Sequence, residues 1–113
     1  MTDDDFTTRL LAELNLDDVD ETRATINSLM KQARAVLVSA INSNVDLKVY
    51  MNDDLFLGAL DALTTQLFYD RTLENNFSLG VQMMLVQLQA KYLNEGGDSN
   101  GNAQNSWVFS LFV

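Results

Sequence analysis

Hydrophobic residues recur at helical spacing in the first two stretches of the chain. Over about residues 4–14, Leu10, Leu11 and Leu14 follow three aspartates, which suit the positive end of a helix. Over about residues 19–42 a single apolar stripe continues for several turns, with the lysine, arginine and glutamine residues largely off it. The pattern therefore predicts a short helix followed by a long amphipathic one.

Between residues 43 and 52 the spacing of hydrophobic positions changes from helical to alternating. Val45, Leu47, Val49 and Met51 are separated by single residues, two of them charged. This alternation predicts a short strand. Because a single strand cannot satisfy its own backbone groups, we expect it to pair with another segment.

Helical spacing returns in two further stretches. The third predicted helix starts at a capping residue, Asn52, Asp53 or Asp54, and runs to about Glu74, where residues 75–76 make a turn. The fourth covers about residues 78–93 and has two apolar rows. These rows are Leu79, Met83, Val86, Ala90 and Leu93, and Val81, Leu85, Leu88 and Tyr92. So wide an apolar surface fits either the central helix of a bundle or a helix that also meets a neighbouring subunit, and both interpretations are open.

The last twenty residues divide into a polar and an apolar part. Residues 94–106 are rich in Gly, Asn and Ser without periodicity, which predicts a flexible linker. Residues 107–113 are almost entirely apolar, and such a segment risks aggregation if it stays in water, so we expect it to dock. The predicted organisation is a helical domain at 1–93, a linker at 94–106 and an apolar docking tail at 107–113.

The apolar tail suits a β partner. If it is extended, alternate side chains from Trp107 to Val113 share one face, with the same period as residues 45–51. Pairing of the two segments could occur within one chain or between chains. The candidate oligomer or partner contacts are therefore Val45, Leu47, Val49, Met51, Trp107, Phe109, Leu111, Phe112 and Val113.

Length and composition agree with one mainly α domain. A chain of 113 residues without proline fits a small bundle of about four helices, with a long extended loop between helices 2 and 3 and a possible short β-pairing with the tail. Seven basic and sixteen acidic residues give a net charge of −9, which repels nucleic-acid phosphates and anionic lipid. No apolar run approaches the roughly 20 residues that span a bilayer, and the start of the chain lacks a secretion signal. We expect a protein made and kept in the cytoplasm, or in a particle assembled there, without membrane contact.

The residue inventory argues against catalysis. The absence of histidine and cysteine removes the commonest general base, the thiol nucleophile and most zinc sites. The acidic residues at 17–21 are explained by a helix start, and neither Asp18 nor Asp98 begins a loop with the glycine and glutamate that calcium binding needs. We expect no enzyme activity, cofactor or metal; a carboxylate-dependent enzyme is the remaining enzymatic hypothesis.

Two apolar pairs and one arginine have alternative roles. Phe68–Tyr69 and Met83–Met84 could line a binding groove, or could belong to the core as apolar residues at helical spacing usually do. Arg71 could stack on Tyr69 or pair with an acidic residue, or could be a solvated arginine at a helix end.

Three short sequences share their order and spacing with one known family. Residues 10–17, followed by the acidic turn and the long alanine-containing helix, resemble the opening of the phage head-tail connectors, the head-completion adaptors beneath the portal. Residues 68–71 resemble that family's aromatic-aromatic-polar-Arg signature, and residues 86–89 resemble the Gln-Leu-Arg word of its last helix. The residues that match these words are Phe68, Tyr69, Arg71, Gln87 and Leu88. Thr72 and Gln89 depart from the pattern, since an acidic residue and an arginine are usual there.

The resemblance implies a non-enzymatic structural protein of the virion, assembled in the cytoplasm of a host bacterium. Such a subunit is expected to form a ring, a dodecamer on the portal protein, that extends the DNA channel and receives a tail-side stopper or tail-completion protein. The charge is consistent with this role, because an acidic channel wall offers few cations to replace the counterions of passing DNA, which would slide past without specific binding. The alternative is a small helical adaptor or regulatory protein that binds one protein partner.

Overall fold

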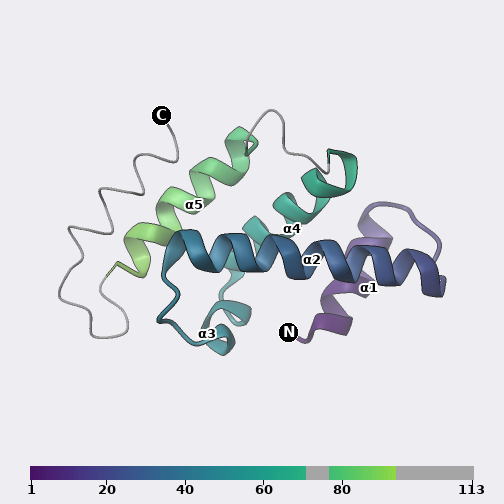
Figure 1. The fold of residues 1–113 in the computed structure, drawn as a ribbon, viewed down its shortest axis with the longest axis horizontal. Coiled ribbons are helices and arrows are strands. Elements are labelled where there is room, and N and C mark those ends of the chain that lie inside the picture. The colour runs from purple at the N-terminus through teal and green to yellow at the C-terminus, as the bar shows by residue number, and fades with distance from the viewer. Residues whose placement is uncertain (71–76, 94–113) are drawn as a thin grey trace.

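The computed structural model of the chain describes residues 1–70 and 77–93, and these residues form five helices (Figure 1). The helices are α1 (Asp3–Glu13), α2 (Asp20–Ile41), α3 (Leu47–Met51), α4 (Asp54–Tyr69) and α5 (Leu79–Lys91). The prediction of a small, mainly α bundle is confirmed, and the described residues contain no strand. The predicted linker at 94–106 and docking tail at 107–113 lie outside the described residues.

Helix α1 begins and ends with local hydrogen bonds that its sequence encodes. The Thr2 hydroxyl accepts a hydrogen bond from the Asp5 backbone N–H at 3.1 Å and caps the first turn. At the other end Asn15 adopts a φ of 60°, while the N–H groups of Asn15 and Leu16 donate to the carbonyls of Ala12 and Leu11. This is a Schellman ending, in which asparagine takes the left-handed position that glycine usually fills.

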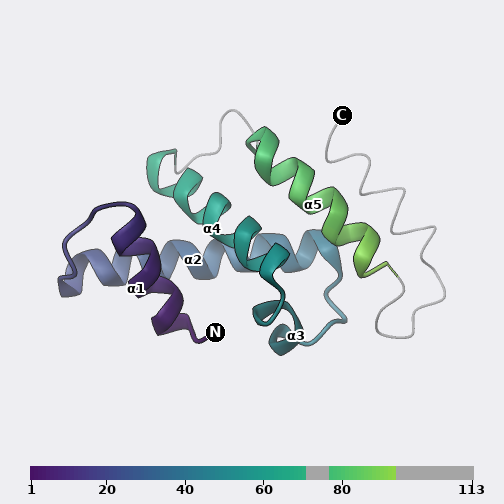
Figure 2. The same ribbon diagram turned by 180° about the vertical axis from the view of Figure 1, so that it is seen from behind.

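Helix α2 is the central element of the described fold. It packs against α1, α4 and α5, and Figure 2 shows these three helices lying across one side of it. The buried positions of α2 recur every three or four residues, as in the predicted stripe; they are Ile26, Leu29, Met30, Ala33, Leu37, Ala40 and Ile41. The long amphipathic helix is confirmed, and α2 takes the central place that the sequence left open for the last helix.

The strand predicted at residues 43–52 is wrong, because residues 47–51 form the short helix α3. The Asp46 side chain accepts a hydrogen bond from the Lys48 N–H at 3.0 Å and caps this helix. Tyr50 and Met51 are both buried, although neighbours in a strand point to opposite faces. The long extended loop therefore contains a helical turn, and residues 45–51 offer no strand with which the tail could pair.

Tyr50 explains why the alternating pattern failed. Its ring stacks on Phe56 with centroids 4.7 Å apart and meets Tyr92 edge-on at 4.9 Å. Its hydroxyl donates to the Asn42 carbonyl at 2.6 Å. A fully buried aromatic residue gains more from these contacts than the local preference of a five-residue segment can offset.

Helix α4 ends earlier than the predicted residue 74. The Asp70 backbone is not helical, with φ −141° and ψ 88°, so the helix stops at Tyr69. The Gln66 side-chain carbonyl accepts a hydrogen bond from the Ser78 N–H at 3.0 Å and links this end of α4 to the start of α5. Residues 71–76, including Arg71, Thr72 and the predicted turn at 75–76, lie outside the described residues.

All five helices contribute to one hydrophobic core. Its largest fully buried side chains come from every helix and are Tyr50, Phe6, Phe56, Leu10, Leu11, Ile26, Met30, Leu37, Leu60, Leu63, Leu67 and Leu85. A shared core of this kind fixes the positions of the helices relative to one another. The surface of α5 is therefore presented in a defined direction.

Candidate functional site

An exposed apolar row on α5 is the most distinctive surface of the described residues. Leu79, Met83 and Val86 are 72%, 57% and 50% exposed, and Ala90 is exposed as well. Their spacing of four, three and four residues is that of a coiled-coil seam, so the four side chains lie in line along the helix. We refer to Leu79, Met83, Val86 and Ala90 as the α5 row.

The second predicted row of α5 faces the core. Val81, Leu85 and Leu88 are fully buried, and Tyr92 is 5% exposed. The helix thus carries apolar residues on both sides, of which the bundle covers only one. Of the two interpretations left open by the sequence, the central helix of the bundle is α2 and not α5, and contact of α5 with a neighbouring subunit stays a prediction.

Polar contacts at its C-terminal end hold α5 firmly on the bundle. The Gln89 amide donates to the Ala40 carbonyl at 2.9 Å, and the Asn42 amide donates to the Tyr92 carbonyl at 2.9 Å. Both bonds are buried and join α5 to the end of α2. Gln89, which departs from the resemblance, therefore serves as a cap for α2, and its residue type suits that contact.

Asp53 forms a second anchor between α4 and α5. Its carboxylate caps α4 by accepting from the Leu55 N–H at 2.9 Å, and it also accepts from Lys91 Nζ at 2.8 Å and from the Tyr92 hydroxyl. Burial acts to raise the pKa of Asp53, but the hydrogen bonds from Lys91, Tyr92 and Leu55 outweigh it and lower that pKa below its ordinary value of 3.8. The charged carboxylate is therefore the stable form in this position.

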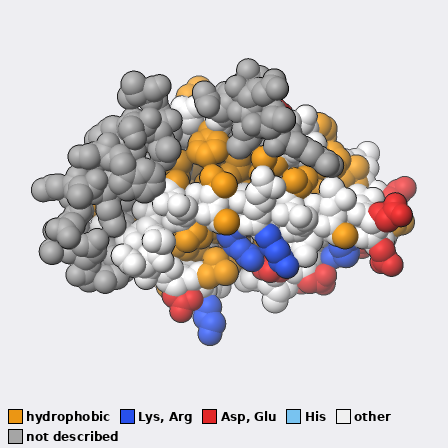
Figure 3. Space-filling view, in the orientation of Figure 1, with side chains coloured by type: hydrophobic (Ala, Val, Ile, Leu, Met, Phe, Trp, Pro, Cys, Tyr) orange, Lys and Arg blue, Asp and Glu red, His pale blue; other side chains and the backbone are white. Residues whose placement is uncertain are grey.

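Charge is distributed unevenly over the protein. Eight of the sixteen acidic residues occupy the first 21 positions; they are Asp3, Asp4, Asp5, Glu13, Asp17, Asp18, Asp20 and Glu21. Helix α5 contains no acidic residue and a single cation, Lys91. Figure 3 shows hydrophobic side chains gathered beside α5 and acidic ones at the opposite end of α2. We call the region of α1 and the start of α2 the acidic pole.

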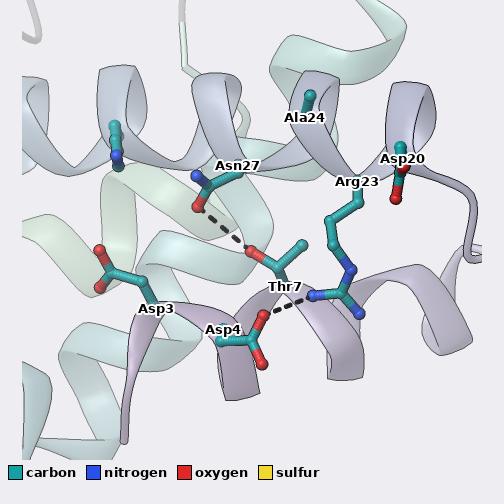
Figure 4. Close-up of a pocket in the computed structure, with 8 residues that line it drawn as sticks. Asp3, Asp4, Thr7, Asp20, Arg23, Ala24 and Asn27 are labelled. Carbon is teal, nitrogen blue, oxygen red and sulfur yellow. Dashed lines mark hydrogen bonds and ion pairs between the residues drawn. The ribbon is translucent and has the colours of Figure 1, made fainter.

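The acidic pole includes a shallow groove between α1 and α2 (Figure 4). Its volume is about 410 Å³, and it is lined by Asp3, Asp4, Thr7, Asp20, Arg23, Ala24, Asn27 and Lys31. Arg23 crosses it, with one nitrogen 2.8 Å from Asp4 and two others 2.9 Å from the Asp18 oxygens. These hydrogen bonds from Arg23 lower the pKa of Asp18. The arginine thus links the loop before α2 to α1. This structural role explains the charged residues of the groove without a bound ligand.

The predicted contact residues at 45–51 do not form one surface. Leu47 and Val49 are 40% and 48% exposed, whereas Met51 is buried and Val45 packs partly against the core. The five predicted contacts at Trp107, Phe109, Leu111, Phe112 and Val113 lie outside the described residues. Only two of the nine candidates are thus located on the described surface.

The residues that carry the resemblance separate into exposed and buried ones. Tyr69 is 72% exposed and meets Phe68 edge-on at 5.1 Å, while Phe68 packs partly against the core. Gln87 is exposed beside the α5 row, and Leu88 is buried. In each apolar pair that the sequence singled out, one member, Tyr69 or Met83, points outward, so neither pair is wholly core.

Sequence reasoning missed the anchors at the ends of α2, α4 and α5. Asp53 was recognised as a possible helix cap, but its contact with Tyr92 joins residues 39 positions apart. Tyr50 was assigned to a strand. A polar residue at the very end of a predicted helix, such as Asn42, is the one local signal that could have indicated the cluster.

Among residues 1–70 and 77–93 no group of three or more acidic side chains is arranged to hold a metal ion. No helix in the described part of the chain is long and apolar enough to cross a membrane. Comparison of the chain with protein-family models, curated proteins and solved structures gave no match.

Proposed function

We propose that this protein is a structural subunit that joins the head of a tailed phage to its tail, assembling as a ring on the portal and extending the DNA channel. The observation that carries the proposal is the separation of the acidic pole from the α5 row. Half of the acidic residues lie at one end, and an apolar row without any acidic residue lies on α5. A ring subunit needs both kinds of surface, one for the lumen and one for its protein neighbours.

The acidic pole suits a wall that DNA passes without binding. Binding of DNA is driven largely by cations that replace the counterions of the phosphates. Of the cations near these aspartates, Arg23 is already paired with Asp4 and Asp18, and Arg34 with Asp3 at 2.7 Å, while Lys31 lines the groove. Such a surface repels a phosphate backbone and gives it few partners.

The α5 row suits contact with another protein. Apolar residues in line on a rigid helix can pack against a neighbour in the manner of helix-in-groove recognition. Two exposed residues of the resemblance, Tyr69 and Gln87, lie at the end of α4 and on α5. The order of the helices α1, α2, α4 and α5 also follows the order on which the resemblance to head-tail connectors rests.

Electron microscopy and native mass spectrometry with the matching portal test this proposal. We expect rings coaxial with the portal for the wild-type chain, and loss of these rings for the variant Met83→Glu/Val86→Glu. The matched control Ala35→Glu/Ser39→Glu places the same two charges at exposed positions of α2, and we expect it to form rings. An acidic pole located on the outer rim of an assembled ring would contradict the channel role.

The α5 row would also serve an adaptor that binds one protein partner. The symmetry of the assembled complex distinguishes this function from that of a ring subunit. A ring subunit meets copies of itself through two different surfaces, whereas an adaptor forms a complex of fixed small stoichiometry. A one-to-one complex with a regulatory protein, without rings on a portal, would establish the adaptor function instead.

A further inference from the structure

The α5 row is wide enough to require an occupant. Three large apolar side chains that are at least half exposed, Leu79, Met83 and Val86, stand in line over about 11 Å of helix at 1.5 Å per residue, and Ala90 extends the row to about 17 Å. No acidic residue interrupts this helix. An uncovered row of this kind is a typical contact surface or an aggregation risk.

The chain itself carries a segment that fits this row. Residues 107–113 read Trp-Val-Phe-Ser-Leu-Phe-Val and contain no charged side chain. Seven residues span up to about 23 Å when extended, which is enough to cover the row. From the sequence and the exposed row together we propose that, in the free subunit, residues 107–113 dock on the α5 row of their own chain. This inference does not rest on the proposed function.

The length of the intervening chain favours docking within one molecule. Residues 94–106 connect the end of α5 to this segment, and thirteen residues rich in glycine and polar residues have a typical reach of about 20 Å. This reach is similar to the length of α5, so the segment can return along the helix from which it leaves. A linker of this size holds its segment at an effective concentration on the order of millimolar. A second copy in dilute solution, which also bears a charge of −9, competes poorly with that.

The chain contains a convenient reporter, because Trp107 is its single tryptophan. In the full-length protein we expect Trp107 emission to be blue-shifted and shielded from acrylamide. In the variant Met83→Gln/Val86→Gln we expect a red shift and a several-fold larger quenching constant, with unchanged helical circular dichroism. Glutamine suits an exposed helix position, so the fold should be retained. The matched control Leu47→Gln/Val49→Gln should behave as wild type.

Other occupants give different results. Shielding that disappears on hundred-fold dilution would mean that a second copy covers the row and would overturn the proposal. Emission that is already red-shifted in the wild type, or that does not respond to the α5 variant, would overturn it as well. None of these readouts involves ring formation. Docking of residues 107–113 can therefore be refuted while the connector function stands, and the connector function can be refuted while the docking stands.

Cysteine trapping provides an independent measurement, because the chain has no cysteine of its own. In the double variant Val86→Cys/Phe109→Cys, oxidation of the two thiols to one disulfide by a mild oxidant should yield a cross-linked monomer. A disulfide requires Cα atoms within about 7 Å, so the bond reports close approach. The control Val49→Cys/Phe109→Cys should cross-link much more slowly. Covalent dimers from the α5 pair would identify the second copy as the occupant and refute docking within the chain.

Discussion

Replacement of Asp53 tests whether the contacts at the end of α5 hold the bundle together. Asp53→Ala removes the cap of α4, which typically contributes about 1 kcal/mol, and a hydrogen bond to the buried end of Tyr92, which contributes about 1–1.5 kcal/mol. Lys91 is 54% exposed on its side chain, so its ion pair adds at most about 1 kcal/mol after solvent screening. We expect a loss of about 2–3.5 kcal/mol, a large share of the roughly 5–15 kcal/mol of a typical domain.

Asp53→Asn separates the charge from the cap. Asparagine is as good an N-cap as aspartate, so this variant should lose less than Asp53→Ala, about 1 kcal/mol. Urea unfolding followed by far-UV circular dichroism measures both losses, and with a slope near 1 kcal/mol per molar the alanine midpoint should fall by about 2–3.5 M. Equal midpoints for wild type and Asp53→Ala would show that the contacts of Asp53 contribute nothing to stability.

The pH dependence of the unfolding free energy, compared between wild type and Asp53→Asn, tests the role of the Asp53 charge. Because the folded-state pKa of Asp53 is lower than its ordinary value of 3.8, its contribution is complete above that value and is lost as pH falls through the lower folded-state pKa. The difference in unfolding free energy between wild type and Asp53→Asn should therefore be constant near neutral pH and shrink below about pH 4. A difference that grows on acidification would refute this explanation.

Substitutions at two further positions test the core and the end of α1. Leu63→Ala, at a fully buried position of α4, should cost about 2–5 kcal/mol, as measured by urea unfolding; a loss below about 1 kcal/mol would contradict its place in the core. Asn15→Gly should leave the melting temperature unchanged or raise it, whereas Asn15→Ala should lower stability by about 1 kcal/mol, because the φ of 60° suits glycine and disfavours alanine. Equal melting temperatures for the two Asn15 variants would contradict the left-handed ending.

The sequence predicted the helices whose local pattern is strong, and it failed where contacts between distant residues decide the conformation. Helices α1 and α2 were predicted within one or two residues because each has a continuous apolar stripe and a clear acidic start. Helix α3 was mistaken for a strand because five residues carry too little periodicity to distinguish the two. What decides the conformation there is Tyr50, which is held by Asn42, Phe56 and Tyr92 from three other parts of the chain.

The sequence predicted the residues of the α5 row but not their exposure. The two apolar rows of α5 could be identified from spacing alone, but spacing cannot tell which row faces the bundle. The choice depends on the anchors at Gln89 and Asp53, each of which joins positions tens of residues apart. The grouping at residues 45–51 failed for the same reason, since alternation describes neighbours along the chain and burial depends on distant residues.

Docking of residues 107–113 and assembly through the α5 row would compete, because the row can hold one occupant at a time. If the segment is docked in about nine-tenths of free subunits, the row is open in about one-tenth, and the apparent affinity for a neighbour falls about tenfold. A chain shortened to residues 1–93 should then form rings at a correspondingly lower concentration in the presence of the portal, as measured by native mass spectrometry across a dilution series. All five helices lie within the retained residues, so its circular dichroism per helical residue should match that of the full chain. Rings that need more protein after the deletion would mean that residues 94–113 add to the contact between subunits, and competition would be excluded.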